Sequence, residues 1–250
     1  MIEESADFRN ELYARYVSAF KTQQLHRNQK ELESFVSWSE RKHLPLLKGL
    51  NKNASILEIG CGDGKLLHML KKNGYNNIEG IDISEEQIML AKSEGLNVKT
   101  ADIFTFLSDK ICCYDAIIAI DVVEHFYKQE VLRLFRLFQK ALKPNGILLL
   151  QTPNGEGLFP GQVIYGDLTH LCIFTPNSMR QILQLNGFSN IFFHETTPIG
   201  DNLLGKVRLL LWSFIKGIVN TIRLIEGGKG KKIDVLTENF ICFCQKIESK

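Results

Sequence analysis

Four acidic residues stand at or beside the ends of predicted β-strands, and they are the first candidates for chemistry in this chain. They are Glu58, Asp82, Asp102 and Asp121. In an open α/β sheet a ligand binds beyond the carboxyl ends of the strands, near the point where the strand order reverses. Carboxylates in this register therefore predict a binding site for a polar ligand.

Two of these carboxylates suggest which ligand groups they bind. Asp82 presents two oxygens, which match the two vicinal hydroxyls of a ribose. Asp102 can accept a hydrogen bond from the exocyclic amine of a purine, and Ile83 and Ile103 can lie on either face of that ring. The pattern predicts a nucleoside as one part of the ligand.

A glycine-rich turn precedes these carboxylates. Apolar residues at 56–59 predict a buried strand, residues 65–72 predict a helix, and Gly60, Gly62 and Gly64 form the turn between them. Without a Cβ the backbone can approach a ligand closely, and the N–H groups of the helix start favour a polar or anionic group. The spacing differs from the dinucleotide fingerprint G-x-G-x-x-G, because the third glycine comes one residue early.

Strands and helices alternate through the rest of the chain. Predicted strands cover 56–59, 78–83, 97–100, 114–120, 147–151 and 188–194, and a seventh lies within 233–247. Predicted helices cover 65–72, 84–94, 130–142 and 175–186. This alternation predicts an α/β fold with a doubly wound, mostly parallel sheet and helices on both faces.

The sequence suggests one catalytic domain with additions. Residues 1–50 are an amphipathic helical extension, which either covers core surface or forms a lid over the cleft. Residues 51–195 are the core, including a loop-rich insertion at 153–174 that we expect to cover the cleft. Residues 196–250 hold an amphipathic helix and the final strand.

Composition is that of an ordinary globular protein. The 250 residues are 44% hydrophobic and 23% charged, with a net charge of +2, which gives no whole-molecule argument for nucleic-acid binding. The six cysteines include no CxxC pair, so reduced thiols and a cytoplasmic location are expected. The acidic N-terminus is not typical of a signal peptide.

Residues 203–225 repeat apolar side chains at helical spacing, with Lys206, Lys216 and Arg223 broadly opposite, and a basic glycine-rich loop follows up to Lys232. Two interpretations stay open. The helix packs on the sheet or on a second subunit, or it lies peripherally on an anionic inner membrane surface. The sequence does not distinguish a monomer from a homodimer.

The ordered set of motifs resembles the class I S-adenosylmethionine-dependent methyltransferases. The matching segments are LEIGCGDG at 57–64, GIDIS at 80–84, ADI at 101–103, YDAIIAIDVVEH at 114–125 and LKPNGIL at 142–148. The segments GDLTH at 166–170 and FTP at 174–176 look like small-molecule members, especially those of bacterial surface-polysaccharide pathways and the ubiquinone O-methyltransferases. So does LYARYVS at 12–18.

The resemblance implies a Rossmann-like seven-stranded sheet whose antiparallel last strand is inserted between strands five and six. It also implies that Gly60, Cys61 and Gly62 line the methionine part of S-adenosylmethionine. By the same resemblance Asp82 holds the ribose, and Asp102 with Ile103 holds the adenine, whose other face Ile83 covers. Asp121 and Val122 border the site of methyl transfer. Glu58 and Gly64 complete the predicted cofactor set.

Methyl transfer to a hydroxyl requires alignment of the acceptor and removal of its proton. Histidine suits that task near neutral pH, and His170 and His125 are the candidate bases. Either could instead have a structural role. Asp167 could orient His170 or bind a substrate hydroxyl. The remaining histidines at 26, 43, 68 and 194 are expected to be surface or packing residues.

The preferred interpretation is an O-methyltransferase acting on a sugar, whether nucleotide-linked, lipid-linked or part of a glycan, or on another small polar metabolite. Methylation of a quinol or of a nitrogen is the nearest alternative. A nucleotide-dependent oxidoreductase and a non-catalytic cofactor-binding protein are the others. Nucleic-acid acceptors are disfavoured, because the chain carries neither an Asn/Asp-Pro-Pro-aromatic motif nor a Pro-Cys nucleophile. No metal ligand set is predicted.

Overall fold

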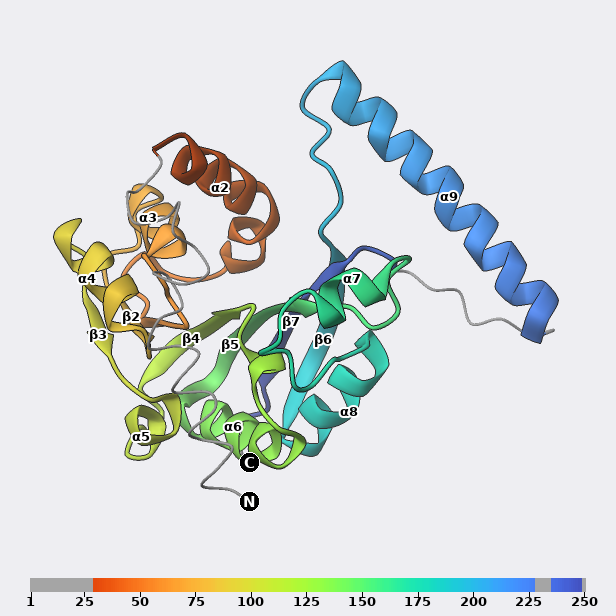
Figure 1. The fold of residues 1–250 in the computed structure, drawn as a ribbon. Coiled ribbons are helices and arrows are strands. Elements are labelled where there is room, and N and C mark those ends of the chain that lie inside the picture. Colours follow the sequence, from red (N-terminus) through yellow and green to blue (C-terminus); the bar gives the residue numbers. More distant parts are fainter. Residues whose placement is uncertain (1–28, 228–234, 249–250) are drawn as a thin grey trace.

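The strands of the chain form one mixed sheet, which follows the predicted topology (Figure 1). The computed structural model describes residues 29–227 and 235–248. In these ranges the strands are β1 (Ile56–Ile59), β2 (Ile78–Asp82), β3 (Val98–Thr100), β4 (Tyr114–Ile120), β5 (Leu142–Pro153), β6 (Phe188–Glu195) and β7 (Asn239–Lys246). Their order is β3-β2-β1-β4-β5-β7-β6, and β7 runs antiparallel to both of its neighbours. The predicted Rossmann-like sheet is confirmed.

Apolar side chains alternate between the two faces of the central strands. In β1, Leu57 and Ile59 join one buried cluster and Ile56 joins the other. In β4, Ile117 and Ile118 divide in the same way, and neither is exposed. Strands that are buried on both faces read as continuous apolar runs, which is why the sequence identified them.

Helices cover both faces of the sheet. One face carries α2 (Gln29–Lys42), the short helix η3 (Leu44–Leu47), α3 (Lys65–Lys72) and α4 (Glu85–Ser93). The other carries α5 (Ile103–Leu107), α6 (Lys128–Ala141) and α8 (Pro176–Leu185). The N-terminus of α4 follows the expected chemistry, because the Ser84 hydroxyl accepts a hydrogen bond from the Gln87 amide.

The described part of the N-terminal extension packs against α3 rather than over the cleft. Glu40 accepts a hydrogen bond from Asn73 at 3.0 Å and pairs with Lys72 at 2.9 Å. His43 is fully buried beneath this segment. The sequence left open whether residues 1–50 cover core surface or form a lid. The described residues 29–50 cover core surface, and the predicted helical residues 5–28 lie outside the described chain.

The insertion at 153–174 contains one short helix, α7 (Pro160–Tyr165), that the sequence did not predict. The amides of Leu171 and Cys172 both donate to the carbonyl of Glu124, at 2.8 and 2.9 Å. A parallel bridge joins Asn154 to Phe174. These contacts fix the end of the insertion beside the short helix η4 (Val123–His125), which follows β4.

Helix α9 (Leu203–Gly227) projects away from the sheet (Figure 1). Gly205 is its only buried residue among those described. Trp212 and Lys216 hold the helix to the body by donating to Glu195, at 3.1 and 2.7 Å. Packing on the sheet, one of the arrangements that the sequence left open, is not the arrangement that the structure shows for α9. None of the described helices is long and apolar enough to cross a membrane.

Candidate active site

A cavity of about 490 Å³ opens at the carboxyl ends of the parallel strands. Eight of the predicted cofactor residues line it: Gly60, Gly62, Asp82, Ile83, Asp102, Ile103, Asp121 and Val122. The three predicted catalytic residues His125, Asp167 and His170 line the same cavity. The fold therefore brings together predicted site residues that lie as far apart in the sequence as Gly60 and His170. The volume of the cavity is within the range of small-molecule sites.

The glycine turn forms a close-fitting wall of this cavity. Gly60 has φ +65°, and a Cβ on it would lie 2.5 Å from Cγ2 of Val122. Gly62 also has a positive φ, and its amide donates to Asp82 at 2.9 Å. Only glycine can adopt a positive φ here without strain and let the backbone lie this close to Val122.

Asp82 and Asp102 both hold backbone groups while facing the cavity. One Asp82 oxygen accepts from Gly62, and the other accepts from the Ser84 amide at 2.8 Å. Asp102 is the N-cap of α5, where one of its oxygens accepts from the Thr105 amide at 2.9 Å. A carboxylate has about four acceptor sites, so these bonds leave capacity for a ligand.

Three predicted cofactor residues do not line the cavity. The Cys61 side chain turns toward Gly80, whose Cβ would lie 2.8 Å from its sulfur, so only the Cys61 backbone belongs to the turn. Gly64 packs under Leu96, 2.3 Å from where its Cβ would be. Glu58 is buried below the turn, where burial and the neighbouring charges of Asp63 and Asp82 raise its pKa well above the usual range.

Asp121 sits at the end of β4 in a left-handed conformation with φ +54°. The side-chain amide of Gln151 donates toward both Asp121 oxygens at 3.3 Å. Because left-handed backbone is unfavourable for residues other than glycine, a position held in it by its surroundings is a candidate for function.

Beyond Asp121, a polar cluster is formed by Glu124, His125, Asp167 and His170. The rings of His125 and His170 lie 5.0 Å apart between centroids. Nδ1 of His170 donates to the Val163 carbonyl at 2.7 Å. This bond assigns the lone pair of a neutral His170 ring to Nε2.

The tautomer of His125 follows from its neighbours. The Thr169 hydroxyl is 2.6 Å from an Asp167 oxygen, and it must donate there because a carboxylate only accepts. Nδ1 of His125 lies 2.8 Å from that hydroxyl and 3.1 Å from the Thr169 carbonyl, so this nitrogen carries the proton. Burial and the nearby His170 lower the pKa of His125 to about 4, which keeps the ring neutral at neutral pH.

Glu124 is the functional candidate that sequence reasoning missed. It is fully buried, Thr152 donates to its Oε2 at 3.0 Å, and its Oε1 has no hydrogen-bond partner among the described residues. Burial and the Asp121 carboxylate raise its pKa well above the usual range. The signal in the sequence was the acid directly before His125.

A cavity that joins a glycine cradle to carboxylates at successive strand ends fits a nucleoside with an amino-acid tail. Residues 25–191 match the methyltransferase domain family. The chain belongs to the S-adenosylmethionine-dependent methyltransferases. The family and fold predicted from the sequence are confirmed, and S-adenosylmethionine is the cofactor of this family.

Relatives cover parts of the chain. The mitochondrial ubiquinone biosynthesis O-methyltransferase of Rattus norvegicus is 28% identical over 154 residues, which are 54% of this chain and 44% of that protein. The cyclopropane-fatty-acyl-phospholipid synthase of Escherichia coli K12 is 29% identical over 155 residues, 60% of this chain and 40% of that protein. The chain thus spans less than half the length of these relatives.

The fold is shared with solved methyltransferases. A SAM-dependent methyltransferase from Archaeoglobus fulgidus superposes with a TM-score of 0.64 at 21% identity, covering 86% of this chain and 94% of that one. At this identity the likeness concerns the fold alone.

Proposed function

We propose that the protein transfers the methyl group of S-adenosylmethionine to a hydroxyl of a small polar acceptor, with a sugar as the first candidate. The observation that carries this proposal is the polar cluster of His125, Asp167 and His170 in the same cavity as Asp82 and the glycine turn. A cavity with both parts can hold a cofactor and an acceptor side by side.

The chain's own residues would divide the work as follows. S-adenosylmethionine supplies an electrophilic methyl group whose departing thioether needs no acid. The glycine turn and Asp82 would fix the amino-acid and ribose parts, and Asp102 would take the adenine amine. His170 would remove the acceptor proton through Nε2. Asp167 accepts a hydrogen bond from the Thr169 hydroxyl and, through Thr169, holds His125.

A sugar is favoured by the polar groups of the acceptor side. Asp167, His170 and Asn239 line this part of the cavity and can each bond a hydroxyl. Within the described chain no Lys or Arg side chain lines the cavity, which disfavours a nucleic acid because phosphates are bound chiefly by such cations. A quinol is the alternative, since one relative is named for ubiquinone and Phe126 and Val163 add apolar surface.

We further propose that the protein is cytoplasmic and that α9 lies on an anionic membrane surface. All six cysteines are free thiols, which agrees with a reducing compartment. Large apolar side chains of α9 are exposed, with Leu210 at 72% and Phe214 at 67% of full exposure. Such a surface is typical of a contact site, and Lys206 and Arg223 on the same helix suit anionic lipid.

Mass spectrometry tests the reaction. The full chain is incubated with S-adenosylmethionine and a panel of sugar nucleotides, lipid-linked sugars and quinols, and a gain of one methyl group on a sugar is expected. Methylation of the quinol alone would replace the sugar proposal. Thermal shift should show stabilisation by S-adenosylhomocysteine and none by NAD, whereas the reverse result would favour an oxidoreductase. Cofactor binding without methylation of any acceptor would favour a non-catalytic role.

Vesicle co-sedimentation tests the membrane contact. Binding to vesicles with anionic lipid, weakening at high salt, is expected for the full chain. The variant Leu210→Ser/Phe214→Ser should lose it, while the matched polar-side variant Ser213→Ala should not. A wild-type protein that forms a homodimer through α9 and ignores the vesicles would overturn this proposal.

A further inference from the structure

Two neighbouring cysteines, Cys112 and Cys113, are exposed on the loop that precedes β4, whereas the other four cysteines are buried. Their amides donate to the carbonyls of Lys140 and Ala141, at 2.9 and 2.8 Å, which fixes the loop against the end of α6. Cys112 is held in a left-handed conformation with φ +49°. A residue other than glycine that its surroundings hold in this conformation is a candidate for function.

The two sulfur atoms have opposite hydrogen-bonding roles. Nζ of Lys246 donates to Sγ of Cys112 at 3.8 Å, whereas Sγ of Cys113 donates to the Ile111 carbonyl at 3.4 Å. These roles are fixed, because an ammonium group only donates and a carbonyl oxygen only accepts. The Cys112 sulfur therefore turns lone pairs toward a cation, and the Cys113 thiol keeps its proton.

The cation behind Cys112 is buried and lacks a carboxylate partner. The Lys246 residue is only 6% exposed, and its other hydrogen bond goes to the Leu142 carbonyl at 2.7 Å. Among the described residues no carboxylate pairs with it. Burying an ammonium group is costly unless it is paired, and negative charge on the Cys112 sulfur would complete the pairing. Exposed sulfur beside a lysine is typical of reactive cysteines.

Three lysines near this loop outnumber its one acidic residue. They are Lys110, Lys140 and Lys246, and the acid is Asp109. Nζ of Lys140 donates to the Ser108 carbonyl at 2.9 Å, and Lys110 pairs with Asp109 at 3.1 Å, so both ammonium groups lie at the loop. This surplus of positive charge favours an anionic reaction partner.

We propose that Cys112 is a modification site, at which an anionic low-molecular-weight disulfide of the oxidised-glutathione type forms a mixed disulfide with the protein. The Cys112 thiolate would attack one sulfur of that disulfide. A sulfur–sulfur bond forms to Cys112 as the bond within the reagent breaks, and the departing thiolate takes a proton from water. Cys112 is oxidised in this step, and the departing half of the reagent is reduced.

Cys113 is too close in the chain to displace the bound thiol. The Cα atoms of adjacent residues are about 3.8 Å apart, below the range of about 4.4–6.8 Å that ordinary disulfides span. A disulfide between Cys112 and Cys113 would therefore be strained. The mixed disulfide should persist until an external thiol reduces it.

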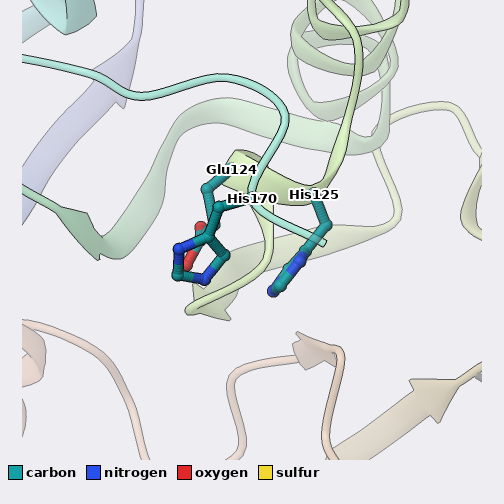
Figure 2. Close-up of side chains that lie close together, drawn as sticks. All are labelled: Glu124, His125 and His170. Atoms are coloured by element: carbon teal, nitrogen blue, oxygen red, sulfur yellow. The ribbon is translucent and has the colours of Figure 1, made fainter. Parts of the chain in front are cut away.

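This site lies at the end of the sheet opposite the cavity. Figure 2 shows Glu124, His125 and His170, three side chains that line the cavity beyond the carboxyl end of β4. Cys112 and Cys113 directly precede Tyr114, the first residue of β4. The modification is therefore separate from the proposed methyl transfer, and its test does not require an identified acceptor.

Mass spectrometry of the full chain treated with oxidised glutathione tests the proposal. One glutathione per chain is expected, on Cys112, and dithiothreitol should release it. Cys112→Ser should abolish this modification, whereas the matched variant Cys113→Ser should keep it. Both positions are exposed, so neither substitution should prevent folding. In denaturing urea the two cysteines should react at similar rates, because the contact with Lys246 is then lost.

Lys246→Met tests the role of the buried cation with a neutral side chain of similar length. Modification should slow by about 3-fold or more, because a hydrogen bond to a charged sulfur is worth about 10-fold or more in thiolate and part of this gain is offset by lower nucleophilicity. Lys143→Met is the matched control, since Lys143 pairs with Asp115 and should not affect the rate.

Three results would overturn the proposal. They are modification of Cys113 as fast as Cys112 in the folded protein, formation of a disulfide between the two, and no modification of the wild type at either position. A Lys246→Met protein that is folded by circular dichroism and reacts as fast as wild type would also overturn the part assigned to Lys246.

Discussion

Nε2 of His43 lies 3.2 Å from Oε1 of Gln151, so a buried histidine of the N-terminal extension contacts a side chain of β5. Gln151 in turn donates to Asp121, and Nδ1 of His43 lies 3.0 Å from the Ser39 hydroxyl. Burial lowers the pKa of His43 to about 4, so the ring is neutral. Each group therefore donates a hydrogen bond to the next: the Ser39 hydroxyl to His43, His43 to Gln151, and Gln151 to Asp121 at the cavity.

This chain of bonds predicts an effect of Gln151→Leu on the cofactor site. The substitution removes the donor to Asp121, and hydrogen bonds to charged groups contribute about 1.5–3 kcal/mol, so S-adenosylhomocysteine affinity should fall about 10-fold or more. Calorimetry measures this affinity. The control Ser39→Ala breaks the far end of the chain and should lower stability but not affinity. Equal S-adenosylhomocysteine affinity in Gln151→Leu and wild type would show that these hydrogen bonds contribute to packing and not to cofactor binding.

Gly60→Ala should weaken cofactor binding through the backbone. The new Cβ would lie 2.5 Å from Val122, and φ +65° adds strain of about 1–2 kcal/mol for a non-glycine residue. S-adenosylhomocysteine affinity should fall by at least about 10-fold, as one such clash of about 1.4 kcal/mol would give. Gly95→Ala is the matched control, because Gly95 has φ +70° and open space around it. It should lose stability and keep its affinity.

The strands and the glycine cradle could be predicted from the sequence because their signals are local. Apolar runs buried on both faces and positive-φ glycines depend on neighbouring residues alone. The direction of the Cys61 side chain, the burial of His43 and the meeting of Glu124 with His170 depend on tertiary contacts between distant segments. No periodicity encodes those contacts.

The same reasoning explains the errors on helices. α5 and α7 span five and six residues, which is too short for an apolar repeat to show. The apolar repeat of α9 is long and regular, but such a repeat identifies only the apolar face of a helix and not the surface against which that face packs. The side toward the body is set by Trp212 and Lys216 meeting Glu195, a residue of the preceding strand.

His170→Ala should reduce turnover by about 100-fold or more while leaving S-adenosylhomocysteine affinity unchanged. Removing a general base costs this much, and His170 belongs to the acceptor side of the cavity rather than to the glycine turn. Initial rates with an accepted substrate and calorimetry with S-adenosylhomocysteine separate the two effects. His194→Ala should match the wild type in both. Unchanged turnover in His170→Ala would remove this residue from the mechanism.

Glu58 should make the stability of the protein depend on pH. Its pKa is raised by burial first and by Asp63 and Asp82 next, so the folded state holds a proton that the unfolded state releases. Stability due to this group is full below the unfolded pKa of about 4.5 and is lost as pH rises toward the folded pKa, by at most about 1.4 kcal/mol per pH unit.

Glu58→Gln removes this proton linkage and keeps the shape of the side chain. Chemical unfolding of the two proteins between about pH 4 and 8, without cofactor, measures the difference. The free energy of unfolding of the variant, relative to that of wild type, should increase as pH rises, because the glutamine side chain has no charge to bury. A difference that is constant across this range would show that Glu58 is ionised in the folded protein.

Glu195→Ala should release α9 from the body without unfolding the protein. Glu195 accepts hydrogen bonds from Trp212, Lys216 and the Leu236 amide, at 3.1, 2.7 and 2.9 Å. Partly exposed ion pairs contribute about 0–1 kcal/mol, so global stability should change by no more than roughly that amount. The local effect should be larger, because α9 has only one buried residue of its own in the described chain.

Acrylamide quenching of Trp212 fluorescence, in a Trp38→Phe background that leaves one tryptophan, reports this release. Trp212 should be quenched more strongly in Glu195→Ala than in the parent, and its anisotropy should fall. Glu226→Ala, at the exposed far end of α9, should change neither quantity. Identical quenching in Glu195→Ala and its parent would show that contacts other than those of Glu195 fix the helix.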